Sequence, residues 1–253
     1  MNAIVTIAGY TVLEMLRNRL LRFVGAYFLV LFLLSRFIGE LAIIETVSFE
    51  SAFLGALLRF STVVMTGLLV ITGMVREFHD KGMMLILSLP ISRTRYLLGK
   101  FMGFGALAVF LAMASCLLLL APAPLDQVML WGISLICELL IIGAFSLLCV
   151  FTLEQVTPAF VATMSFYLLS RGIETFQLMA SAREIETLAN GIIAGVMDAI
   201  AFVLPELYRF TATDWLVYHS GTGSMLLPIL GQTSVYLILL TGMALFDFYR
   251  KNL

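Results

Sequence analysis

Long apolar runs alternate with short charged segments along most of the chain. A helix needs about 20 apolar residues to cross a lipid bilayer, and six runs come close to that length. They lie at residues 21–37, 53–75, 101–121, 128–151, 158–180 and 225–248. Another apolar stretch, residues 192–204, is too short to cross and predicts a short external helix, re-entrant or interfacial. The pattern predicts an all-α, polytopic integral membrane protein with six transmembrane helices in a single domain, residues 1–253.

The residues before the first run have the pattern of an amphipathic helix. Apolar residues recur at spacings of three and four from Ile4 to Met15, whereas Glu14 and Arg17 fall on the other side. This predicts an elbow helix over residues 2–20 that lies on the membrane surface. The alternative is a plain N-terminal extension of the first transmembrane helix.

The composition has the same implication. Of the residues, 61% are apolar and 12% charged, and the mean hydropathy is +1.05, whereas a soluble domain is about half apolar and about a quarter charged. A chain of this size cannot bury so much apolar surface internally, so part of it must face lipid. This excludes a soluble enzyme. Cys116, Cys137 and Cys149 lie in apolar runs without metal-ligand spacing, and we expect no metal site.

Basic residues gather on one side of the predicted membrane. Ten of the 15 flank that side: Arg17, Arg19, Arg22, Arg76, Lys81, Arg93, Arg95, Lys100, Arg250 and Lys251. The opposite side carries mainly acidic residues. Because cytoplasmic loops are rich in Lys and Arg, we expect both termini to be cytoplasmic in a bacterial inner membrane. The external segment is then residues 181–224.

The first predicted internal loop, residues 76–100, is the most informative segment. Charged residues mark its two ends: Glu77, Asp80, Lys81 and Arg93. Its middle, residues 83–89, is apolar but too short to span, and Pro90 ends it. A short amphipathic helix here has nothing in its own loop against which to bury its apolar side. It either lies on the membrane or docks into a groove on a cytoplasmic partner.

This loop contains the motif Gly82-Met-Met-Leu-Ile-Leu-Ser88-Leu-Pro90, followed by Tyr96-Leu-Leu-Gly99-Lys100. Weaker motifs are Glu14-Met-Leu-Arg17 before the first crossing and Leu204-Pro205-Glu-Leu207-Tyr-Arg-Phe210 outside. Together they resemble the permease subunits of type-2 ATP-binding-cassette (ABC) exporters, in which the loop motif also follows the second crossing. The branch most similar is the one named for multicopper-enzyme maturation and nitrous oxide reductase assembly, a name that fixes no substrate.

The resemblance implies a partner and a role for the loop. It implies a homodimer or pseudo-dimer of six-helix subunits, and a cytoplasmic ATPase subunit that grips the loop. By matching position, the coupling element is Glu77, Asp80, Lys81, Gly82, Pro90 and Arg93. ATP and Mg²⁺ would be bound by the ATPase subunit, and we expect no cofactor in this chain and no nucleic-acid partner.

The chain itself lacks the phosphate-binding loop of an ATPase. That loop needs Gly-x-x-x-x-Gly-Lys before Ser or Thr, so that backbone amides surround the phosphates. The nearest match, Gly99-Lys100, has Thr94 in place of the first glycine and Phe101 in place of the hydroxyl residue. We therefore expect a transport subunit and not an enzyme.

Four ionisable residues lie inside predicted crossings and away from their ends: Arg59, Glu138, Arg171 and Glu174. A charge in the hydrocarbon region is costly, so each such residue marks either a functional site or a pair. In the functional interpretation they line a polar, outward-opening cleft between protomers. In the structural interpretation Arg59 pairs with Glu138, and Arg171 pairs with Glu174 three residues along the same helix.

Two other functions fit the same pattern. One is a membrane scaffold or mechanotransmission subunit, in which the ATPase drives an external protein docked on residues 181–224. The other is an ion-coupled secondary transporter that uses Glu138 and needs no ATPase. Gly99 and Gly103 form a small-xxx-small pair at the start of the third crossing, which we assign to close helix packing.

Overall fold

The computed structural model describes residues 3–41, 46–80, 91–181, 195, 199–201 and 203–250. Within these ranges no strand occurs, which confirms the all-α class. The long helices are α1 (Ala3–Arg17), α2 (Arg19–Leu41), α3 (Thr46–His79), α5 (Arg93–Leu119), α6 (Leu125–Leu153), α7 (Val156–Ser181) and α10 (Leu226–Arg250). Between α7 and α10 lie the short helical segments η1 (Leu207–Arg209), α9 (Thr213–Val217) and η2 (Gly223–Met225).

Five helices of the described chain are long and apolar enough to cross a membrane: α2, α3, α5, α6 and α10. They occupy the first four predicted crossings and the last one, and they indicate a multi-pass membrane protein. The helix α7 occupies the fifth predicted crossing but is not one of the five. Arg171 and its polar neighbours lower the mean hydropathy of this helix.

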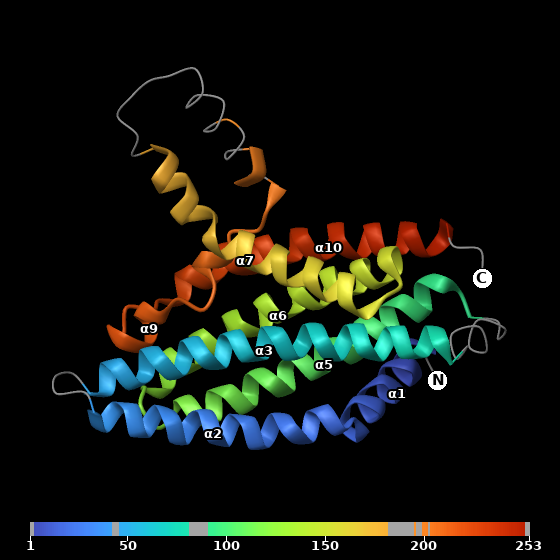
Figure 1. Cartoon of the computed structure of the whole chain (residues 1–253). Helices are drawn as coiled ribbons and strands as arrows, with labels where there is room; N and C mark the ends of the chain where they lie inside the picture. Colours follow the sequence, from blue (N-terminus) through green and yellow to red (C-terminus); the bar gives the residue numbers. More distant parts are fainter. Residues whose placement is uncertain are drawn as a thin grey trace.

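The five helices lie side by side as an elongated bundle (Figure 1). Both chain ends lie at one end of the bundle, and α9 lies at the other end. The central helix is α6, which contacts α3, α5, α7 and α10. Of the 18-residue apolar stretch of α6 that is long enough to cross a membrane, 72% is buried within the protein. Its apolar side chains, for example Leu135, Leu139 and Ile142, form the middle of the hydrophobic core.

Residues with special backbone preferences end the helices around α6. The helix α5 ends just before Pro122 and Pro124, because proline cannot continue a helix, and Pro124 is the N-cap of α6. At the other end of α6, Glu154 adopts a left-handed conformation with φ 57° and closes the helix. Short connections of this kind place α5, α6 and α7 in alternating directions.

The helix α1 is separate from α2, and the break lies at Asn18. Its apolar face packs on α5 through Ile7 and Thr11, and Met15 lies against Gly73 of α3. A Cβ atom built on Gly103 would lie 2.6 Å from the Cβ of Thr11. The small-xxx-small pair of α5 therefore serves the contact with α1.

The external segment is described mainly over its second half. The predicted short helix at residues 192–204 lies largely outside the described residues, although residues 199–201 are helical. The described turn that runs from Pro205 through η1 to α9 packs against α3, α6 and α7. Leu207 and Phe210 in this turn are fully buried. The part of the predicted external segment that enters the bundle is thus the motif from Leu204 to Phe210.

Candidate functional site

An ion cluster holds α1, α3 and α5 together where the loop at residues 76–100 begins and ends. Arg76 and Glu77 come from the last turn of α3, Glu14 from α1 and Lys100 from α5. Arg76 donates to Glu14, and the Lys100 ammonium forms an ion pair with Glu77. A second carboxylate, that of Glu14, lies 3.9 Å from the same ammonium.

Lys100 is the buried centre of this cluster. Its side chain is 6% exposed, and its ammonium lies 5.9 Å from the centre of the Tyr96 ring. A buried lysine is stable only when carboxylates compensate its charge. The two carboxylates come from two different helices, so the cluster fixes α1 and α3 relative to α5.

Arg93, a predicted coupling residue, lies at the opposite side of the loop base. Its guanidinium donates to the backbone carbonyls of Phe248 at 2.8 Å and Tyr249 at 3.3 Å. It also lies over both of their aromatic rings. A cation at the C-terminal end of a helix satisfies its last carbonyls and favours its dipole. Arg93 therefore joins the start of α5 to the end of α10.

The other predicted coupling residues divide into two groups. Glu77 is nearly buried in the ion cluster, with its side chain 11% exposed. Asp80 follows α3 and is exposed. Lys81, Gly82 and Pro90 lie outside the described residues.

A second polar cluster is buried beside the turn that contains Thr211, around Glu138 of α6. The Glu138 side chain is completely inaccessible to solvent. One carboxylate oxygen accepts a hydrogen bond from the Thr211 hydroxyl at 2.7 Å, and the other lies 3.7 Å from the Arg171 guanidinium. Ser134, one helical turn earlier on α6, accepts a hydrogen bond from the backbone N–H of Thr211 at 2.9 Å.

Two arginines bind the same turn of the external segment. Arg171 of α7 donates to the carbonyls of Leu207 at 2.6 Å and Phe210 at 2.8 Å. Arg59 of α3 donates to the carbonyl of Thr211 at 3.1 Å. Backbone groups that enter a membrane protein without regular structure must find partners inside the protein. Here α3, α6 and α7 supply those partners.

The predicted charge pairs need correction. Within the described residues Glu138 forms its ion pair with Arg171, and no ion pair joins it to Arg59. Arg171 does not pair with Glu174, which is exposed on α7. Arg59 is bound to the carbonyl of Thr211, and Arg171 reaches across to α6 instead of along its own helix.

Five participants were not predicted as parts of a site: Glu14, Arg76, Lys100, Ser134 and Thr211. Glu14 and Lys100 lie inside motifs that the sequence analysis singled out, but nothing in one sequence pairs residues 86 positions apart. Thr211 has a φ of 45°, a left-handed conformation that L residues rarely adopt. The sequence indicates only that the intramembrane charges need polar partners, and it does not indicate that Thr211 is one of them.

Both clusters join side chains and backbone groups of several helices. In the described part of the chain, no group of three or more His, Cys, Asp and Glu side chains is placed to hold a metal ion. Comparison with known proteins finds no family model that matches the chain and no curated protein that matches it.

Proposed function

We propose that the chain is the permease subunit of an ATP-driven exporter, with six crossings, an interfacial α1 and both termini in the cytoplasm of a bacterial cell. In this arrangement α7 is the remaining crossing. A cytoplasmic ATPase subunit binds the loop at residues 76–100, and a second copy of the chain completes the complex. The observation that carries the proposal is the ion cluster of Glu14, Arg76, Glu77 and Lys100.

The cluster supports the proposal because it makes the base of the loop rigid. A loop can transmit the motion of a bound ATPase only if its two ends move with the helices that they join. Here α3 leads into the loop and α5 leads out of it. Lys100 connects these helices through Glu77, and Arg93 connects α5 to α10. A displacement of the loop would therefore move three helices of the bundle together.

The helix α3 also supports transmission over a longer distance. Near one end it carries Glu77, and in its outer part it carries Arg59, which binds the external turn at Thr211. Their 18-residue separation corresponds to about 27 Å along a helix. One continuous helix thus connects the cytoplasmic loop with the external segment.

This connection also favours a second candidate function. In a mechanotransmission subunit, the ATPase would act through α3 on an external protein docked on residues 181–224. The contacts from Arg59 and Arg171 to the external turn are the structural link that such a mechanism needs. Ion-coupled transport through Glu138 gains less support, because its carboxylate is engaged by Thr211 and Arg171.

The experiment is purification of the tagged full-length chain from its native host in mild detergent, followed by an ATP-hydrolysis assay. We expect a nucleotide-binding subunit and ATPase activity to accompany the chain. The double charge reversal Asp80→Lys/Lys81→Glu should lower the accompanying activity about ten-fold or more, which corresponds to a binding loss of about 1.4 kcal/mol.

Two controls make this test specific. Glu40→Lys reverses an exposed charge at the other end of the bundle and should leave the ATPase bound. Arg93→Gln should instead lower the thermal stability of the whole chain, because it removes the bonds to Phe248 and Tyr249. Full ATPase activity with the double reversal, or none with the unmodified chain, would contradict the proposal. A vesicle export assay then separates export from mechanotransmission.

A further inference from the structure

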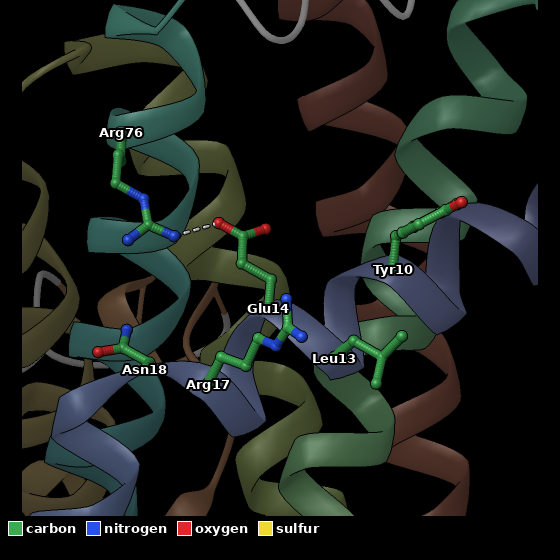
Figure 2. A pocket seen from close by; sticks show the side chains of 6 residues that line it. All are labelled: Tyr10, Leu13, Glu14, Arg17, Asn18 and Arg76. Carbon is green, nitrogen blue, oxygen red and sulfur yellow. Dashed lines mark hydrogen bonds and ion pairs between the residues drawn. The ribbon is translucent and has the colours of Figure 1, made fainter.

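A recess of about 440 Å³ lies between α1 and the end of α3. Its lining consists of Tyr10, Leu13, Glu14, Arg17, Asn18 and Arg76. Figure 2 shows Arg76 reaching from α3 toward Glu14 on α1, with the other α1 side chains along the recess. This volume is within the range of small-molecule sites, which is about 300–1,000 Å³.

The charged groups around the recess leave an excess of positive charge. The carboxylate of Glu14 is bound by Arg76 and lies near Lys100, which also pairs with Glu77. Arg17 lines the same recess, is exposed, and forms no ion pair with any described residue. The group thus contains three cationic side chains but only two carboxylates. The remaining positive charge favours an anionic ligand.

The outer face of α1 is apolar next to this charge. Val5, Leu13 and Leu16 are 61%, 57% and 50% exposed, on the side of α1 away from the face buried on α5. In a membrane protein such an outward apolar strip lies among lipid acyl chains. Leu13 belongs both to this strip and to the lining of the recess. The recess thus joins an apolar surface to a cationic one, as the boundary between acyl chains and headgroups requires.

We propose that this recess, which we call the elbow recess, binds the phosphate group of an anionic phospholipid. Guanidinium groups match the geometry of phosphate oxygens with paired hydrogen bonds. Arg17 supplies the uncompensated charge, and Arg76 presents its remaining N–H groups beside Glu14. The acyl chains extend over Leu13 and toward Phe23 of α2, whose side chain is 68% exposed. The inference rests on the membrane position of the bundle and not on the exporter proposal.

The physical consequence is a lipid that occupies the junction of α1, α2 and α3. The same Arg76 belongs to the ion cluster at the base of the loop. Occupancy by an anionic headgroup would add a further ligand to Arg76 and strengthen the attachment of α1. The site is therefore placed to make the rigidity of the loop base depend on the lipid composition.

The test is native mass spectrometry of the delipidated full-length protein, titrated separately with phosphatidylglycerol and phosphatidylcholine. We expect tighter binding of phosphatidylglycerol. Arg17→Gln should weaken this binding about five-fold, the loss expected for one basic residue at an anionic membrane surface. Arg17→Lys retains the charge and should lose less. Arg95→Gln is the matched control, because Arg95 is exposed and lies outside the lining of the recess.

Competition with inorganic phosphate distinguishes a lipid site from a site for a free anion. The proposal is supported if inorganic phosphate does not displace phosphatidylglycerol, and if the affinity for this lipid is lower in Arg17→Gln but unchanged in Arg95→Gln. Displacement of the lipid by inorganic phosphate would overturn the lipid assignment. Equal binding of the two lipids, or equal losses in the two glutamine variants, would overturn the site itself. Thermal melts of each variant show that the chain remains folded.

Discussion

At the scale of single residues, the chemistry of this protein is dominated by charges that are buried and shared. Glu138 is completely inaccessible to solvent, and it has both a hydrogen bond from Thr211 and an ion pair with Arg171. Lys100 is similarly enclosed by Glu14 and Glu77. A buried charge without a partner is strongly destabilising, whereas a well-paired one can be nearly neutral. These residues therefore specify which helices meet.

The pairing of Glu138 leads to a double-mutant prediction. Glu138→Gln should lower the melting temperature, because Arg171 then lacks a counter-charge. Arg171→Gln should also lower it. The combined change should cost less than the sum of the two, with a coupling energy of about 0.5–3 kcal/mol, as for other residues in contact. Melting of the purified chain in detergent measures all three variants.

Arg59 provides the matched comparison for the double-mutant analysis of Glu138 and Arg171. It donates to the carbonyl of Thr211, whose hydroxyl donates to Glu138, and within the described residues it forms no ion pair with that carboxylate. The coupling of Arg59→Gln with Glu138→Gln should therefore be smaller than the coupling of Arg171→Gln with Glu138→Gln. Additive effects of the Glu138 and Arg171 changes would show that the ion pair does not act in the folded protein. The opposite order of couplings would assign the carboxylate to Arg59.

At the scale of elements, close approach of α1 and α5 depends on two glycines. A Cβ atom at Gly99 would lie 2.8 Å from the Cβ of Ile7, and one at Gly103 would lie 3.2 Å from the carbonyl oxygen of Ala8. The helices meet backbone to backbone at this point, so α1 is bound by packing as well as by Glu14. Its position then determines the elbow recess.

This contact predicts opposite effects for the same substitution at two positions. Gly103→Ala should destabilise the protein by about 1–3 kcal/mol, as overpacking does, and should expose a cysteine introduced at Ile7 to labelling. Gly143→Ala on α6 adds a methyl group with no heavy atom within 4 Å. It should be neutral or stabilising, by up to about 1 kcal/mol, because alanine favours the helix. A stabilising effect at both positions would contradict the assigned contact.

At the scale of the whole molecule, the chain ends lie at one end of the bundle and α9 lies at the other (Figure 1). That arrangement agrees with an even number of membrane crossings if α7 also crosses, in addition to the five membrane-length helices. The helix α7 is therefore the element on which the topology depends. Its polar residues have protein partners, since Arg171 binds carbonyls of the external turn.

Cysteine labelling tests this topology. With Cys116, Cys137 and Cys149 replaced by alanine, single cysteines at Glu40, Asp126 and Thr222 should react with an impermeant reagent added outside intact cells. Cysteines at Asp80 and Arg95 should react only after the membrane is opened. The reason is that the two groups lie at opposite ends of the bundle. Labelling of Thr222 on the same side as Asp80 would exclude the six-crossing arrangement.

The sequence alone determined the helical class and most of the helices, because apolar runs of membrane length have one stable conformation in lipid. Apolar spacing of three and four residues also predicted a helix ahead of the first crossing, where α1 lies, and its place on the membrane surface stays a prediction. The alternation of helix directions followed from the polar connections between them. Predictions of this kind succeed because they depend on residues close together in the chain.

Only the tertiary structure decided which distant residues meet. Glu138 pairs with Arg171 and not with Arg59, whose guanidinium donates to the carbonyl of Thr211. Arg93, expected from the motif to couple a partner, also binds the end of α10, a contact that no motif predicts. The spacing of charged residues along a sequence does not reveal their partners, because one cation can pair with any of several carboxylates. Only the three-dimensional packing selects the pair. The same packing formed the elbow recess from α1 side chains and Arg76, which lie more than 50 residues apart in the sequence.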